Sequence, residues 1–150
     1  MALKVGDAIP AFTAITANGT DFNSTSYIGK TPLVIYFYPK DDTPGCTVQA
    51  CTFRDQYQDF KDLGAEVIGV SSDSIDSHKK FVAKYNLPFI LLSDSDKKIR
   101  QLFGVPNDLW GLIPGRATYV IDKNGIIQFV FDNTSAKIHI KKALEILKRM

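Results

Sequence analysis

The apolar run Leu33–Tyr38 (LVIYFY) constrains the fold more than any other segment of the chain. Its aromatic and β-branched side chains follow one another without the polar alternation of a half-exposed strand, so it predicts a buried central strand. A second run, Ala65–Val70, follows a predicted helix over about Pro44–Leu63 that Gly64 ends. Strand, helix and strand in this order indicate an α/β protein with parallel strands.

The rest of the chain continues this alternation. The other predicted elements are a hairpin of Ala11–Ile15 and Thr20–Phe22 around Asn18-Gly19, a helix over Ile75–Tyr85, a strand over Phe89–Leu92, a helix over Asp96–Phe103, strands over Ala117–Asp122 and Ile126–Phe131 joined at Lys123-Asn124-Gly125, and a last helix over about Ser135–Arg149. This order predicts a mixed central sheet with helices on both faces and an antiparallel edge. A thioredoxin-like α/β fold with an N-terminal β-hairpin fits it, although the pattern alone leaves other α/β topologies open. No repeat or linker interrupts residues 1–150, so we predict a single domain.

Composition excludes several classes of function. Hydrophobic residues make up 45% of the chain and charged residues 23%, as in ordinary globular domains. The 18 Lys and Arg nearly balance the 16 Asp and Glu, so the net charge of +2 predicts neither nucleic-acid nor anionic-membrane binding. The segment Met1–Asp7 has no apolar signal core, and no apolar run reaches membrane-spanning length. We therefore expect a soluble, cytoplasmic protein, or a plastid protein if a transit peptide has been removed.

The chain has two cysteines, Cys46 and Cys51, which are too few for a structural disulfide framework. In a reducing compartment such a pair is inert, metal-binding or redox-active. Thr43-Pro44 predicts a helix start, with a hydroxyl residue at the N-cap and proline at the first helical position. Cys46 then lies in the first turn, where free backbone N–H groups and the helix dipole favour the reactive thiolate. Gly45 removes a side chain beside the sulfur, which leaves room for a small substrate.

The predicted helix also separates the two cysteines. One apolar stripe, spaced for a helix face that meets the core, contains Cys46, Ala50, Phe53, Tyr57, Phe60 and Gly64. Cys51 lies about 140° round the helix from Cys46, on a different face. The two cysteines are therefore predicted to occupy different environments.

Two plainer interpretations of the cysteines remain open at this point. Free cysteine is among the most buried residue types, so both could be small core residues. A zinc site would need His78 and His139 to join the pair, but neither has ligand spacing to it. Both histidines fall in predicted surface helices, so we expect solvated side chains and no metal site.

The segment around Cys46 resembles a known active site. Pro39-x3-Thr43-x2-Cys46 matches the signature of the peroxiredoxins, and the longer TPGCTVQAC resembles their peroxiredoxin Q (bacterioferritin comigratory protein) subgroup. The segments VGDAIPAF, LVIYFYP and IPGRATYVIDKNG also fall where that family has counterparts. The likeness covers nearly the whole chain and agrees with the order of elements derived above.

This resemblance implies a role for five residues. Cys46 is the expected peroxidatic cysteine, which attacks the peroxide as a thiolate and becomes a sulfenic acid. Cys51 is the expected resolving cysteine, which forms an intramolecular disulfide with it. Thr43 is expected to direct its hydroxyl toward sulfur and peroxide, and Pro39 to shield the pocket from water. Arg116 is expected to place a guanidinium near Cys46, favouring the thiolate and the charge that develops in the reaction.

Several of these residues have simpler explanations. Thr43 would serve equally well as a helix cap alone, and Pro39 as the end of a strand. Without the resemblance, Arg116 would be taken for a solvated charge. Trp110 is either a loop residue near the site or part of the core, and the sequence does not decide between them.

Three functions are consistent with the cysteine pair. The first is a thiol peroxidase that reduces hydrogen peroxide and organic hydroperoxides and is recycled by a thioredoxin-type dithiol protein. The second is a general disulfide oxidoreductase, although that activity normally uses Cys-x-x-Cys and here four residues intervene. The third is a non-enzymatic redox sensor. We favour the peroxidase. We expect no prosthetic group, because a thiolate cleaves the weak oxygen–oxygen bond unaided. We expect a monomer, because the intramolecular placement of both cysteines requires no partner chain.

Overall fold

The computed structural model describes residues 2–105, 107–108, 113–114, 116–131 and 136–150. Its strands are β1 (Thr13–Thr16), β2 (Asp21–Asn23), β3 (Leu33–Phe37), β4 (Glu66–Ser71), β5 (Ile90–Ser93), β6 (Asn107–Asp108), β7 (Ile113–Pro114), β8 (Ala117–Ile121) and β9 (Ile127–Phe131). Its helices are α1 (Pro44–Asp55), α2 (Tyr57–Asp62), α3 (Ile75–Tyr85), α4 (Lys98–Phe103) and α5 (Ala136–Arg149), with a 3₁₀ turn η1 at Ser24–Ser26. Among these residues one large sheet has the order β2-β1-β5-β4-β3-β8-β9, and β6 pairs with β7 separately.

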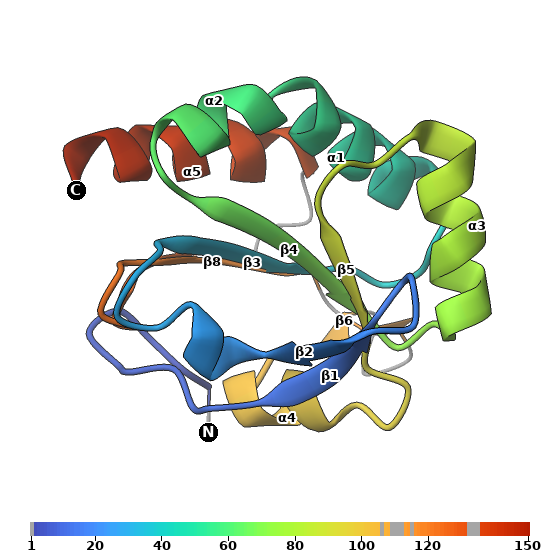
Figure 1. The fold of residues 1–150 in the computed structure, drawn as a ribbon, viewed down its shortest axis with the longest axis horizontal. Coiled ribbons are helices and arrows are strands. Elements are labelled where there is room, and N and C mark those ends of the chain that lie inside the picture. Colours follow the sequence, from blue (N-terminus) through green and yellow to red (C-terminus); the bar gives the residue numbers. More distant parts are fainter. Residues whose placement is uncertain (1, 106, 109–112, 115, 132–135) are drawn as a thin grey trace.

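The predicted central strand lies in the middle of the sheet. β3 pairs with β4 in parallel and with β8 in antiparallel register, and β4 pairs in parallel with β5. All five residues of β3 are buried, as expected for a strand covered on both faces. Helices α1, α2 and α5 cover one face, and α4 lies against the other (Figure 1). The thioredoxin-like mixed sheet predicted from the order of elements is therefore confirmed.

Each face of the sheet has its own apolar core. Val34 and Tyr36 of β3 point toward α1, α3 and α5, whereas Leu33, Ile35 and Phe37 point toward α4 and the N-terminal segment. Cys46 belongs to the first of these cores. The residues of one strand thus anchor both layers, and the loop that leaves its end is fixed relative to both.

Both predicted hairpins are present. Gly19 and Gly125 adopt left-handed φ values of 84°, which the tight turns of the β1–β2 and β8–β9 pairs require. The sequence did not predict that the N-terminal hairpin extends the main sheet. It does so through antiparallel pairs between Ile15 and Ser93 and between Thr16 and Leu92.

One predicted helix is wrong in its extent. Pro44–Leu63 is not continuous, because Gln56 leaves helical geometry (φ −106°, ψ 8°) and divides the segment into α1 and α2. That turn contains neither glycine nor proline, so no residue signalled the break. In the predicted stripe, Ala50, Phe53 and Phe60 are buried, but Gly64 is exposed in the turn after α2.

The predicted exposure of both histidines is also wrong. His78 and His139 are fully buried, and each ring has a polar partner inside the fold. His78 Nδ1 lies 2.6 Å from Asp41 Oδ2, and His139 Nδ1 lies 2.6 Å from Thr118 Oγ1. A buried polar ring is acceptable when its nitrogens are hydrogen-bonded. Helical periodicity alone does not reveal such partners.

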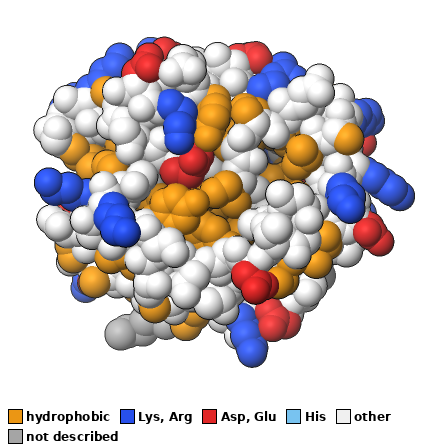
Figure 2. All heavy atoms as spheres, in the orientation of Figure 1, with side chains coloured by type: hydrophobic (Ala, Val, Ile, Leu, Met, Phe, Trp, Pro, Cys, Tyr) orange, Lys and Arg blue, Asp and Glu red, His pale blue; other side chains and the backbone are white. Residues whose placement is uncertain are grey.

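The face of the molecule drawn in Figure 2 agrees with the balanced composition. Figure 2 shows Lys and Arg side chains interspersed with Asp and Glu, and apolar side chains exposed between them. None of the helices that the structure describes is long and apolar enough to cross a membrane.

Candidate active site

The predicted helix start holds Cys46 as expected. Thr43 is the N-cap residue in extended conformation (φ −92°, ψ 156°), and Pro44 begins α1. Cys46 lies in the first turn with only 2% of its surface exposed, and both cysteines are free thiols. Backbone N–H groups of a first helical turn have no partner within the helix, so this position favours a negatively charged sulfur.

A guanidinium lies next to this sulfur. Arg116 precedes β8, and the pairing of Phe37 with Ala117 brings the start of β8 beside the end of β3. Arg116 is 8% exposed, and its Nη2 lies 3.5 Å from Cys46 Sγ. A permanent positive charge at this distance stabilises a thiolate in a site largely removed from water. The structure therefore brings together the two residues that the resemblance paired, 70 positions apart.

Gly45 makes this close approach possible. A β-carbon at this position would lie 3.2 Å from Arg116 Nη2, which is tighter than ordinary van der Waals contact. The missing side chain thus accommodates the guanidinium, whereas the sequence suggested only that it leaves room for substrate.

Sequence reasoning missed Gln49, the residue that orients this arginine. Gln49 lies one helical turn after Cys46, is fully buried, and accepts a hydrogen bond from Arg116 Nη1 at Oε1. This contact leaves Nη2 directed at the sulfur. The available signal was a polar residue three positions after Cys46, on the buried side of the same helix.

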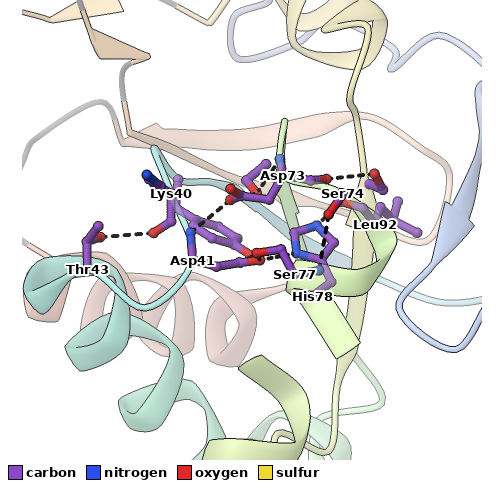
Figure 3. Close-up of polar contacts among 11 residues, drawn as sticks. Lys40, Asp41, Thr43, Asp73, Ser74, Ser77, His78 and Leu92 are labelled. Carbon is purple, nitrogen blue, oxygen red and sulfur yellow. Dashed lines mark hydrogen bonds and ion pairs between the residues drawn. The ribbon is translucent and has the colours of Figure 1, made fainter. Parts of the chain in front are cut away.

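Thr43 and Pro39 lie in the loop between β3 and α1. The Thr43 hydroxyl donates to the Lys40 carbonyl at 2.9 Å (Figure 3) and makes no capping bond to α1. Thr43 thus occupies the N-cap position that was predicted, but its hydroxyl is used differently. Pro39 is half-buried immediately after Tyr38. Among the described residues, Arg116 is the one polar side chain with a hydrogen bond to Cys46.

The floor of the site is aromatic. The Tyr36 ring stacks on Phe53 of α1 with ring centroids 4.6 Å apart, and its hydroxyl has no hydrogen-bond partner among the described residues. Burial raises the pKa of the Tyr36 phenol well above its ordinary value, and the nearby Cys46 and Asp41 raise it further. The Tyr36 phenol therefore stays neutral and does not release its proton. Its ring packs against α1 as an apolar group.

Cys51 is half-buried and helical, on another face of α1 from Cys46. In a regular helix, residues five apart have Cα atoms about 8.7 Å apart. Trp110, whose role the sequence left open, lies outside the described residues.

The cysteines belong to no metal-ligating group among the residues that the structure describes. The group there that meets the geometric requirement is Asp41, Asp73 and His78, whose ligand atoms lie within 4.8 Å of one another. These atoms take part in hydrogen bonds within the protein. His78 Nδ1 contacts Asp41 Oδ2, and Asp73 Oδ2 accepts the N–H of Asp41. Their arrangement is that of a hydrogen-bond network.

Fold and site together define a class of protein. A buried thiol at the start of the helix that follows the central strand of a thioredoxin-like sheet, facing a guanidinium from the neighbouring strand's start, is the arrangement of a thiol peroxidase. The model of the AhpC/TSA family matches residues 5–130. The chain belongs to this family, and it is a peroxiredoxin, as the motif around Cys46 predicted.

Individual relatives agree with this assignment. The chain is 51% identical over 146 residues to "Peroxiredoxin Q, chloroplastic" of Sedum lineare, covering 97% of this chain and 78% of the relative. The structure is similar to that of peroxidoxin BcpB from Mycobacterium tuberculosis, with a TM-score of 0.91, 32% identity, and coverage of 99% of this chain and 98% of the other. Peroxiredoxin Q of Xanthomonas campestris has a TM-score of 0.85 at 32% identity, covering 92% and 90%.

Proposed function

We propose that the peroxidase reaction begins with attack of the Cys46 thiolate on the terminal oxygen of a hydroperoxide. The sulfur–oxygen bond forms as the oxygen–oxygen bond breaks, so the thiol is oxidised to a sulfenic acid and the peroxide is reduced to water or an alcohol. The leaving oxygen takes up a proton. The observation that carries this proposal is the 3.5 Å contact between Arg116 Nη2 and Cys46 Sγ, because a fixed cation stabilises both the thiolate and the departing oxygen.

We assign the other site residues supporting roles. Gln49 holds the guanidinium of Arg116 toward the sulfur. Because Thr43 donates its hydroxyl proton to Lys40, its oxygen is left to accept a hydrogen bond from the O–H of a bound peroxide. Pro39 covers one side of the pocket against water. Each role follows from position and chemistry together with the family resemblance.

Cys51 completes the cycle in this proposal. Its thiol attacks the sulfenic sulfur, which releases water and forms a Cys46–Cys51 disulfide. A dithiol protein of the thioredoxin type then reduces the disulfide with two electrons, restoring both thiols. Since the two cysteines lie on one helix, the cycle needs no partner chain. We therefore propose a monomer in which residues 1–150 form one functional domain.

The names of relatives support a proposal on substrate range and location. A solved structure of the Xanthomonas campestris bacterioferritin comigratory protein, 30% identical, is described by its alkyl peroxide reduction activity. We propose that this chain likewise accepts alkyl hydroperoxides as well as hydrogen peroxide. The Sedum lineare relative is named as chloroplastic, so we consider a plastid location alongside the cytoplasmic one.

A coupled assay tests this function. Reduced protein is mixed with hydrogen peroxide or tert-butyl hydroperoxide in the presence of thioredoxin, thioredoxin reductase and NADPH. We expect continuous NADPH oxidation that depends on peroxide and stops in Cys46→Ser. Insulin reduction without peroxide consumption would instead identify a general disulfide oxidoreductase. A single stoichiometric oxidation without turnover would identify a redox sensor.

A further inference from the structure

The loop between β3 and α1 is attached to α3 through a buried carboxylate. Asp41 lies in the middle of this loop, two residues from both Pro39 and Thr43, and is buried. Its Oδ1 accepts the Tyr38 hydroxyl at 2.5 Å. Its Oδ2 accepts the Ser77 hydroxyl at 2.8 Å and lies 2.6 Å from His78 Nδ1 (Figure 3).

The second nitrogen of His78 fixes where the ring carries its protons. Nε2 lies 2.8 Å from the Leu92 carbonyl oxygen, which only accepts hydrogen bonds, so Nε2 carries a hydrogen. The 2.6 Å contact between Nδ1 and Asp41 Oδ2 is the second hydrogen bond of the same ring. The fully buried ring thus joins the loop, α3 and β5 in one network.

Among the described residues, the titratable groups that face His78 are Asp41 from the loop, Asp73 from the segment after β4, and Tyr38, which directly follows β3. Burial raises the pKa of Tyr38 well above its ordinary value, with Tyr36 and Asp41 adding to the effect, so this phenol stays protonated and donates to Asp41. The mechanism described above uses neither Asp41 nor His78.

The same network reaches Thr43 through a single peptide unit. The N–H of Asp41 donates to Asp73 Oδ2 at 2.8 Å, and Asp73 Oδ2 also accepts the Ser71 hydroxyl at 2.7 Å. The carbonyl of that same peptide group belongs to Lys40 and accepts the Thr43 hydroxyl at 2.9 Å. A peptide group is planar, so holding its N–H fixes the direction of its carbonyl. The Asp41 contacts therefore orient the Thr43 hydroxyl.

We propose that His78 is a positioning residue for the peroxidase reaction, which through Asp41 holds the Lys40–Asp41 peptide and with it the Thr43 hydroxyl at the peroxide pocket. The proposal rests on the proposed roles of Cys46 and Thr43. Losing the contact with His78 Nδ1 removes one hydrogen-bonding partner from the buried Asp41 carboxylate. The loop then shifts until another donor reaches this carboxylate. Misplacing a reacting geometry by about 1 Å costs as much as a hundredfold in rate.

Two matched variants separate this role from simple packing. In His78→Asn, the side-chain amide reaches the position of Nδ1 and donates to Asp41, but the Leu92 contact is lost. In His78→Gln, the amide reaches the position of Nε2 and donates to Leu92, but the Asp41 contact is lost. The two variants thus differ mainly in which of the two hydrogen bonds they keep.

The experiment measures the second-order rate of Cys46 oxidation by hydrogen peroxide, the ultraviolet absorbance of the thiolate, and the melting temperature. We expect His78→Gln to lose roughly ten- to hundredfold in rate with an unchanged thiolate fraction, and His78→Asn to stay within about threefold of the wild type. Ser77→Ala, which removes a smaller Asp41 contact, should lose rate in the same direction and provides the test if His78→Gln does not fold.

Equal losses in His78→Gln and His78→Asn that follow their melting temperatures would overturn the proposal, as would an unchanged rate in His78→Gln. The wild-type rate reports on the proposed function itself. A wild-type chain that does not react with peroxide would overturn both ideas. Wild-type reaction with no loss in His78→Gln would overturn only the role of His78.

Discussion

The two segments that flank Cys46 are attached to the fold by different kinds of contact. On one side, the loop before α1 is tied to α3 by side-chain hydrogen bonds of Asp41 and by Asp42, which contacts Lys84 at 2.8 Å and Tyr85 at 2.7 Å. On the other side, the first turns of α1 are held by Arg116 and by apolar packing of its buried face. The loop is fixed by several directional bonds to α3, whereas the helix start is held by one arginine, which contacts Cys46 and Gln49, and by packing.

This difference matters because a disulfide between Cys46 and Cys51 requires movement. Disulfide-bonded residues have Cα atoms less than about 7 Å apart, and an intact helix holds residues five apart at about 8.7 Å. In the proposed cycle the thiolate becomes a neutral sulfenic acid, and its contact with Arg116 then loses its ionic component. In this proposal the segment that unwinds is the one whose contact with Arg116 is weakened by the reaction, while the loop keeps its bonds to α3.

Replacing each cysteine should have the largest effect and should separate their roles. Cys46→Ser should abolish peroxide reduction, because no thiolate remains at the helix start. Cys51→Ser should react once and leave a sulfenic acid that dimedone traps, but should lose thioredoxin-supported turnover unless another thiol substitutes. Mass spectrometry of the trapped adduct measures this. If Cys51→Ser loses the first reaction while Cys46→Ser keeps it, the assigned roles are reversed.

Arg116→Met removes the one arginine that contacts Cys46 and Gln49 at the helix start. We expect the rate of Cys46 oxidation to fall roughly ten- to thousandfold, the scale for removing one preorganised electrostatic group. The thiolate fraction at neutral pH, measured by ultraviolet absorbance, should fall as well. Arg116→Lys is the matched control. It keeps the positive charge but loses the planar guanidinium whose two Nη atoms contact Gln49 and Cys46. An unchanged rate in Arg116→Met would remove this residue from the site.

The features that sequence reasoning found and missed differ in how local they are. The helix start around Cys46 was predictable because Thr43, Pro44 and the preceding strand are adjacent in the chain. Arg116 was found only through the family resemblance, since its contact with Cys46 depends on the pairing of β3 with β8. Gln49 was overlooked although it lies one turn from Cys46, because its partner is the distant Arg116.

His78 shows the limit of helical periodicity. Its neighbours Lys79 and Lys80 are exposed, and the pattern indicated a solvated face. Its burial is explained by Asp41 and Leu92, which come from two other elements and saturate both ring nitrogens. The break at Gln56 likewise had no local signal. Tertiary partners explain the burial of His78, and a single sequence does not show them.

Hydrogen exchange tests the contrast between the two segments directly. In the disulfide form, amides from Thr47 to Phe53 should exchange at least roughly tenfold faster than in the reduced form, because the early turns of α1 have unwound. The β3 amides should keep their protection. The Asp41 amide, bonded to Asp73, should also keep its protection, which extends the comparison to the loop. Equal protection of α1 in both redox forms would sink the idea of local unwinding.

The smallest expected effect is on stability and concerns Asp42, whose exposed side chain joins the loop before α1 to α3. The hydrogen bond from Lys84, followed by that from Tyr85, lowers the pKa of Asp42. A carboxyl group whose pKa is lower in the folded than in the unfolded chain stabilises the fold above its unfolded pKa of about 3.9 and loses this contribution as the pH falls through the folded value. Lys84→Met should therefore unfold at slightly lower urea concentration than the wild type near neutral pH.

This difference between the wild type and Lys84→Met should vanish in strong acid, where Asp42 is protonated in both proteins. It should also shrink at high salt, because the Lys84 and Asp42 side chains are solvent-exposed and therefore screened. Lys80→Met, an exposed lysine on the same helix, is the control and should show no such pH-dependent difference. Peroxide reactivity should be nearly unchanged in Lys84→Met, because the Asp41 network orients Thr43 without it. A large loss of rate would show that both ends of the loop, and not only Asp41, position the site.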